Sequence, residues 1–131
     1  MNIFCGTDIV EINRIEKALE RNGSSFKSRV FTENEILYCE SKSKSKYKSY
    51  AARFAAKEAV SKALGTGIAE GVALKDIEVI NDDRGKPYVK LSGKARELFD
   101  SISGAGISLS LSHSDNYAVA FAIIRTVDKQ V

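Results

Sequence analysis

Residues 50–65 read YAARFAAKEAVSKALG, and this stretch decides the fold. Six of its residues are alanine, the residue with the highest intrinsic helix propensity, and Gly65 follows at the usual position of a helix C-cap. Alanine side chains also allow another element to approach a helix backbone closely. The stretch therefore predicts a long helix from Tyr50 to Leu64 at the centre of the molecule.

The chain before this helix predicts one strand and two further helices. Residues 3–12 form an apolar, β-branched run typical of a buried strand, with Asp8 near its middle. Helical spacing of apolar residues follows as far as Asn22-Gly23, a strong stop signal. Thr32 and Glu35 match a capping box that opens a short helix towards Cys39. The Ser-Lys alternation of residues 41–48 is typical of a mobile loop.

The chain after the central helix predicts two hairpins separated by a helix. Residues 76–80 and 87–91 flank a turn-rich segment, and residues 93–102 have a modest amphipathic helical pattern. Residues 107–113 alternate strictly, and a second apolar run covers residues 117–124. The expected class is α+β, an antiparallel sheet around a long central helix in the order β-ααα-ββ-α-ββ. We expect one domain over residues 1–125 and a tail over 126–131.

Composition excludes several classes of protein. Twenty basic and 17 acidic residues give a net charge of +3, too balanced for a nucleic-acid binder that relies on its overall field. The two cysteines have no metal-binding spacing and are too few for a disulfide framework. No apolar stretch approaches the roughly 20 residues needed to cross a bilayer, and no signal peptide is evident. These features predict a cytoplasmic protein that does not bind membranes.

The central helix also carries residues suited to metal and phosphate chemistry. Glu58 and Lys62 lie one turn apart on one face, where an acidic and a basic group can hold a metal and a phosphate side by side. The same spacing also suits an exposed ion pair of little energetic value. If Asp8 faces Glu58, two carboxylates from separate elements form a site that favours Mg²⁺ over Zn²⁺. Asp8 is equally suited to accept hydrogen bonds from backbone N–H groups at a strand end.

Basic residues gather in two places. Arg14, Lys17 and Arg21 share a face of the first predicted helix, and four lysines lie within residues 42–48. Each group is either a solvated surface or a patch that meets an anionic partner.

Four segments together resemble the holo-acyl-carrier-protein synthases, the small bacterial members of the 4′-phosphopantetheinyl transferases. They are Gly6-Thr7-Asp8-Ile9-Val10-Glu11-Ile12, Phe31-Thr32-Glu33, Arg53-Phe54-Ala55-Ala56-Lys57-Glu58-Ala59 and Ser110-Leu111-Ser112-His113. The match runs from about Ile3 to Ile124, with the segments in the family's order and spacing. It is therefore far more specific than any one motif.

The resemblance implies an enzyme that moves 4′-phosphopantetheine from coenzyme A to a serine of apo acyl carrier protein, with Mg²⁺ as cofactor. It also implies a homotrimer with sites at the subunit boundaries. Asp8 and Glu58 would bind the metal, while Glu58, Lys62 and His113 would be the catalytic residues. The implied coenzyme A contacts are Asp8, Glu58, Ser61, Lys62, Gly65, Lys86, Pro87, Ser112 and His113.

Several of these roles have simpler alternatives. His113 also suits a structural histidine before a turn, Gly65 a helix cap, and Lys86-Pro87 a hairpin turn. The general base is either Glu58 or a water that Glu58 orients. Arg14 and Arg21 are the candidate contacts to the acidic carrier protein.

The rival class is a non-enzymatic module that binds RNA or an acidic protein through its lysine-rich segment and the Arg14 face. The absence of tryptophan and the scattered aromatic residues argue against an RNA-stacking surface, so no nucleic-acid partner is expected.

Overall fold

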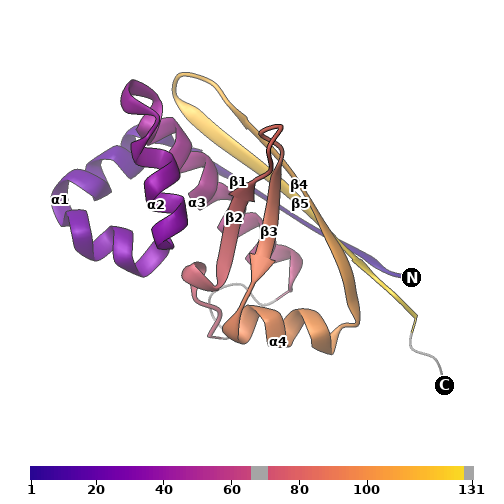
Figure 1. Ribbon diagram of the computed structural model, residues 1–131. Coiled ribbons are helices and arrows are strands. Elements are labelled where there is room, and N and C mark those ends of the chain that lie inside the picture. The colour runs from indigo at the N-terminus through magenta and orange to yellow at the C-terminus, as the bar shows by residue number, and fades with distance from the viewer. Residues whose placement is uncertain (66–70, 129–131) are drawn as a thin grey trace.

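The computed structural model describes residues 1–65 and 71–128, and its elements follow the predicted order (Figure 1). None of the helices in these ranges is long and apolar enough to span a bilayer. The elements are β1 (Ile3–Glu11), α1 (Ile12–Val30), α2 (Glu33–Glu40), η1 (Ser43–Ser45), α3 (Lys46–Ala63), η3 (Leu74–Asp76), β2 (Ile77–Asn81), β3 (Pro87–Leu91), α4 (Gly93–Ser101), β4 (Gly104–His113) and β5 (Tyr117–Thr126).

The central helix α3 packs on a three-stranded antiparallel sheet with strand order β1-β5-β4. Strand β5 pairs with β1 on one side and β4 on the other, while β2 and β3 form a separate hairpin. Ala118, Ala120 and Ala122 of β5 are fully buried, as are Ala55 and Ala59 of α3. Small side chains on both surfaces bring the helix and the sheet close together.

Gly6 is the point of closest approach between β1 and α3. A β-carbon built on Gly6 would lie 2.0 Å from the carbonyl oxygen of Ala59 and 2.8 Å from the backbone nitrogen of Ala63. No side chain fits this gap without moving the helix from the strand. Because side chains alternate along a strand, Asp8 lies two residues on and faces α3 as Gly6 does.

One predicted boundary is confirmed and one is wrong. The first helical stretch ends at Asn22-Gly23 as predicted: Gly23 has a non-helical φ of 21° and ψ of −105°, and a second helical stretch of α1 follows to Val30. The Phe26 ring in this second stretch packs 6.1 Å from Phe31 and 6.4 Å from Phe54, measured between ring centroids. The lysine-rich segment is not a loop throughout, since η1 occupies Ser43–Ser45 and α3 begins at Lys46.

The capping box at the start of α2 is confirmed and belongs to a larger buried network. The Thr32 hydroxyl accepts from the Glu35 N–H at 3.3 Å, and the Glu35 carboxylate accepts from the Thr32 N–H at 2.9 Å. The same carboxylate lies 2.7 Å from the Lys57 ammonium and accepts from the Val79 N–H. Lys57 also donates to the carbonyls of Leu74 and Ile77. This network joins α2, α3 and β2.

Over β1 and β5, the sheet face opposite α3 carries large exposed apolar side chains. Ile3 and Ile9 of β1 are 62% and 63% exposed, and Tyr117 and Phe121 of β5 are 44% and 42% exposed. The predicted buried strand at residues 3–12 is thus covered on one face only. Scattered exposed apolar residues are ordinary, but a group on two paired strands is typical of an interaction surface.

Candidate active site

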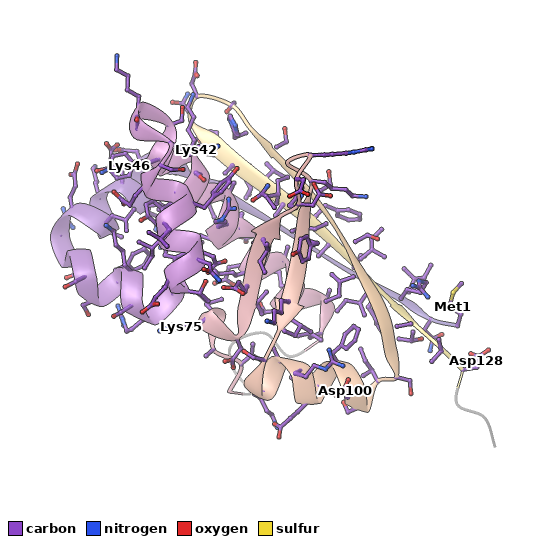
Figure 2. All side chains as sticks on the ribbon, viewed as in Figure 1. Met1, Lys42, Lys46, Lys75, Asp100 and Asp128 are labelled. Atoms are coloured by element: carbon purple, nitrogen blue, oxygen red, sulfur yellow. The ribbon has the colours of Figure 1, made fainter. Side chains whose placement is uncertain are left out.

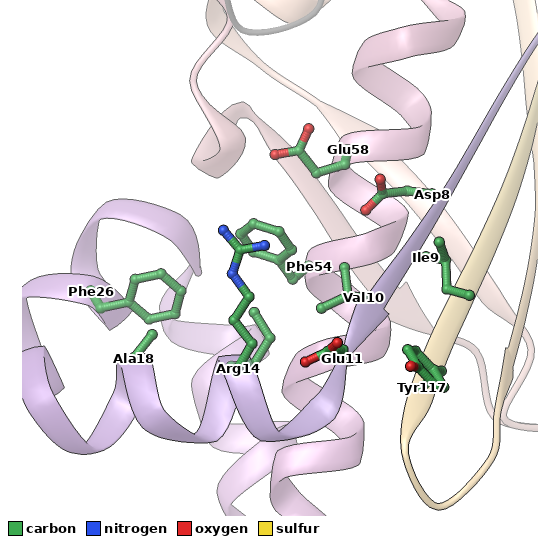
Figure 3. Close-up of a pocket in the computed structure, with 11 residues that line it drawn as sticks. Asp8, Ile9, Val10, Glu11, Arg14, Ala18, Phe26, Phe54, Glu58 and Tyr117 are labelled. Carbon is green, nitrogen blue, oxygen red and sulfur yellow. The ribbon is translucent and has the colours of Figure 1, made fainter.

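Asp8 and Glu58 come together at one pocket of about 720 Å³ between β1, α1 and α3. Figure 3 shows both carboxylates on the same side of α3, with the Arg14 guanidinium reaching towards them past Phe54. The rest of the lining is mainly apolar and includes Phe26. The arrangement meets the condition on which the sequence prediction depended, because the strand carboxylate faces the helix carboxylate.

Lys62 joins this group through Asp8. Its ammonium lies 3.0 Å from Asp8 Oδ1 and donates to the Thr7 carbonyl, also at 3.0 Å. Among the ion pairs of the described residues, Lys62 pairs with Asp8 and not with Glu58, although Glu58 is one turn away on the same helix. Helical spacing suggests an ion pair between Glu58 and Lys62 on the surface of α3. In the structure Lys62 instead connects α3 to Asp8 of β1.

The environment of Glu58 favours its neutral form. Burial raises the pKa of the Glu58 carboxyl, the negative charge of Asp8 raises it further, and Lys62 acts in the opposite direction. Two carboxylates that repel each other in a half-buried pocket gain from a shared cation. Asp8 and Glu58 thus fit Mg²⁺, which accepts one or two protein carboxylates together with waters and substrate phosphates. The described residues contain no group of three or more histidine, cysteine, aspartate or glutamate side chains that could hold a metal ion.

A second pocket, of about 500 Å³, holds another part of the predicted site. Pro87 and His113 line it together with three basic residues, Lys42, Lys48 and Arg53. Figure 2 shows Lys42 and Lys46 at the end of the molecule where α2 passes into α3. The pocket shares no lining residue with the pocket of Asp8 and Glu58.

Arg53 is the best-defined basic group of this second pocket. Its side chain is almost fully buried, stacks 3.9 Å from the ring centroid of Tyr38 and donates to Asn81. Its Nε atom has no hydrogen-bond partner within the described part of the chain. A buried guanidinium with spare donor capacity is suited to an anionic ligand.

Comparison with known proteins identifies the family. A family model described as the 4′-phosphopantetheinyl transferase superfamily matches residues 4–122. The chain belongs to this superfamily. The matched residues include α3, nearly all of β1 and the lining of both pockets. The candidate site therefore lies within the part of the chain that the superfamily shares.

The relatives similar in sequence and structure include several holo-[acyl-carrier-protein] synthases. The holo-[acyl-carrier-protein] synthase of Ruminiclostridium cellulolyticum is 59% identical over 128 residues, which cover 98% of this chain and 96% of the relative. The Helicobacter pylori holo-[acyl-carrier-protein] synthase, solved in complex with coenzyme A, is 35% identical with a TM-score of 0.81 and coverage of 92% and 99%. A synthase–coenzyme A complex from Chronobacterium ammoniagenes has a TM-score of 0.86 at 31% identity, with coverage of 98% and 100%.

The remaining predicted site residues of this transferase line neither of the two pockets. Ser61 is buried and its hydroxyl donates to the Glu58 carbonyl at 2.8 Å, so this hydrogen bond is made within α3. Gly65 has φ of 89° directly after α3, which supports its alternative role as a helix cap. Lys86 and Ser112 are exposed beside Pro87 and His113 respectively. Arg21 is exposed on α1, two turns beyond Arg14.

Arg53 belongs to the family-like segment of the central helix, but the sequence alone does not assign it to a site. The available signal was its place on α3: Arg53 lies one turn from both Ser49 and Lys57, on a helix whose other buried side chains are mostly alanine. A charged residue among buried alanines needs a partner, and the partner came from β2, which spacing along α3 does not reveal.

We expect Glu58→Gln to stabilise the metal-free transferase at neutral pH. A carboxyl whose pKa is raised on folding favours folding when protonated, and this contribution is lost as the pH rises through the folded-state pKa. Removing the charge should therefore raise the melting temperature near pH 8, and the gain should vanish below about pH 4, where the unfolded carboxyl is also protonated. Thermal denaturation with a chelator, from pH 4 to 8, tests this. A melting temperature that falls at pH 8 would contradict it.

Proposed function

We propose that this protein transfers the 4′-phosphopantetheine moiety of coenzyme A to a serine of apo acyl carrier protein and releases adenosine 3′,5′-bisphosphate. The observation that carries the proposal is the meeting of Asp8 and Glu58 at one pocket, with Lys62 paired to Asp8, in a chain 59% identical to a holo-[acyl-carrier-protein] synthase. Two hard oxygen ligands beside an ammonium form a site for a divalent cation and a phosphate.

In this reaction the serine oxygen attacks the β-phosphorus of coenzyme A. The bond from that phosphorus to the bridging oxygen breaks, and the bisphosphate leaves with the bonding pair. Mg²⁺, held by Asp8 and Glu58, would supply charge neutralisation on the pyrophosphate. Glu58, directly or through a water that it orients, would take the serine proton. The Lys62 ammonium would stabilise negative charge on the phosphates.

The second pocket suits the nucleotide end of coenzyme A. Arg53, Lys42 and Lys48 provide positive charge for phosphate, and Tyr38, Pro87 and His113 provide surfaces against which a base can pack. His113 would be a ligand contact in this arrangement rather than a purely structural histidine. Its imidazole is exposed at the end of β4, where a ligand can reach it.

Two half-sites on one chain support a homotrimer in which the carboxylate pocket of one subunit meets the basic pocket of the next. The two pockets share no lining residue, and α3 contributes to both. The exposed apolar face of β1 and β5 provides a surface that association would bury. Sedimentation equilibrium should give three times the chain mass of 14.3 kDa. A cytoplasmic location fits this reaction and these partners.

The decisive experiment is a transfer assay. Purified protein is incubated with apo acyl carrier protein, coenzyme A and Mg²⁺, and intact mass spectrometry follows the addition of phosphopantetheine to the carrier. A parallel reaction with chelator should show no addition. The same assay distinguishes the rival binding module, which would leave the carrier mass unchanged under every condition.

Reversal of charge on α1 should weaken recognition of the carrier. Arg14 and Arg21 lie seven residues apart, nearly two turns, and both are exposed on one face. Because Arg14 also lines the carboxylate pocket, Arg21→Glu is the cleaner variant. It should raise the KM for the acidic carrier by roughly threefold to tenfold at low salt and leave the KM for coenzyme A unchanged. The effect should shrink at high salt.

The double variant Lys75→Glu/Lys94→Glu is the control for charge reversal, since both lysines are exposed and lie outside both pockets. Steady-state kinetics with each substrate varied in turn separates the outcomes. If Arg21→Glu damages both substrates equally, or if the control variant raises the carrier KM as much, the α1 face is an ordinary solvated surface.

A further inference from the structure

Lys62 and a divalent cation would use the same carboxylate. The ammonium lies 3.0 Å from Asp8 Oδ1, and the other described partner of this ammonium is the Thr7 carbonyl. Lys62 is the one described hydrogen-bond or ion-pair partner of the Asp8 carboxylate. The contact therefore engages the carboxylate that the proposed function assigns to Mg²⁺.

The Lys62 ammonium can leave Asp8 without moving the carboxylate. The Lys62 side chain is 51% exposed, whereas that of Asp8 is 17% exposed, so the lysine can leave for solvent while the carboxylate stays in place. An exposed ion pair contributes little free energy, and a lysine has a flexible stem that lets its ammonium change partner. By contrast, Lys57 on the same helix is fully buried and donates to two carbonyls, so it has no comparable freedom.

We propose that Lys62 competes with the metal for Asp8 and changes partner during the reaction cycle. When Asp8 and Glu58 bind a divalent cation, the ammonium is displaced from Asp8 and becomes available to the phosphates of coenzyme A. This inference rests on the proposed function, because it takes the two carboxylates as metal ligands. Before coenzyme A binds, Lys62 weakens metal binding because it occupies Asp8. Once coenzyme A is present, the displaced ammonium binds its phosphates, so metal binding and phosphate binding favour each other.

The proposed exchange predicts that Lys62→Met strengthens the binding of metal alone and lowers kcat. Lys62→Met removes the competitor, so the protein should bind metal alone about fivefold more tightly, the upper end expected for loss of an exposed ion pair. The same variant should have a lower kcat, because the ammonium no longer stabilises charge on the phosphates. A lysine that acts only on phosphate would lower kcat and leave the affinity for metal alone unchanged.

The experiment measures metal binding without coenzyme A. Electron paramagnetic resonance of free Mn²⁺ and calorimetry with Mg²⁺ give the dissociation constants for the parent protein and for Lys62→Met. Arg14→Gln is the matched control, since it removes a positive charge from the same pocket without removing a partner of Asp8. Circular dichroism confirms that each variant is folded.

Exchange predicts clearly tighter binding in Lys62→Met than in Arg14→Gln. Equal tightening in the two variants would show a general field effect and overturn the proposal, as would unchanged affinity in Lys62→Met. Asp8→Asn separates this result from the underlying assignment. If Asp8→Asn binds Mn²⁺ as tightly as the parent protein, the metal assignment of the proposed function fails; if Asp8→Asn loses Mn²⁺ while Lys62→Met is unchanged, only the exchange fails.

Discussion

Asp8→Asn and Glu58→Gln should each reduce phosphopantetheine transfer by at least about 100-fold while the protein remains folded. Each substitution replaces a charged oxygen ligand by a neutral amide of nearly the same size, so packing around β1 and α3 is preserved. The loss of charge removes stabilisation of the transition state, for which single-group losses of this size are typical. Neither side chain belongs to the fully buried core.

Initial rates measured over a series of Mg²⁺ concentrations test this expectation. Both variants should need more Mg²⁺ than the parent protein and should stay slow at saturation. Glu97→Gln on the exposed surface of α4 is the matched control, since it removes a carboxylate away from both pockets. Near-normal activity of either variant at limiting Mg²⁺ would remove that residue from the metal site.

Lys57→Met should lower the free energy of unfolding by about 3 to 5 kcal/mol. The substitution leaves the Glu35 carboxylate, which has 0% exposure, without its ammonium partner. Burial lowers the pKa of the Lys57 ammonium, and the negative charge of Glu35 opposes that change. Urea denaturation of the parent protein and the variant measures the loss.

A second variant separates loss of the pair from loss of packing. In Glu35→Gln/Lys57→Met no charge is left buried alone, and the glutamine retains a carbonyl oxygen that can accept from the Val79 N–H. The double variant should be more stable than Lys57→Met, with a coupling free energy well above the scatter of independent sites. Strictly additive losses would mean that the two groups act independently.

The order of elements was predictable because local signals mark it strongly. The capping box at Thr32, the alanines of α3 and the turn before Pro87 act over a few residues, and each is confirmed. The errors came where tertiary contacts override a local signal. Gly23 does end a helical stretch, but the local signals missed the second stretch of α1, in which Phe26 packs against Phe31 and Phe54.

The lysine-rich segment shows the same effect of distant partners. Its alternation of serine and lysine lacks a hydrophobic period, so sequence predicts a loop. In the structure Lys46 lies 3.5 Å from Glu40, and Lys48 lies 3.2 Å from Asp115 on the β4–β5 connection. These contacts hold the first turn of α3 against neighbouring elements.

The candidate site was predictable only through resemblance to a family. Helical spacing places Glu58 beside Lys62, but it does not say that Asp8 faces them, since that depends on how β1 packs on α3. The second pocket draws residues from α3, β3 and β4, and from the segment between α2 and α3. No local pattern connects such distant segments, and so Arg53 and Asn81 were missed.

If Asp8 and Glu58 bind a cation as proposed, the close backbone contact at Gly6 sets how far apart the two carboxylates lie. The strand touches α3 where a β-carbon would lie 2.0 Å from a carbonyl oxygen, and Asp8 stands two residues further along. An added methyl group would push β1 outward and widen the gap between Asp8 and Glu58. Mg²⁺ needs short, nearly octahedral contacts, whereas Ca²⁺ tolerates longer and less regular ones. Gly6→Ala should therefore shift ion selectivity from the smaller cation towards the larger one, although position 6 carries no ligand at all.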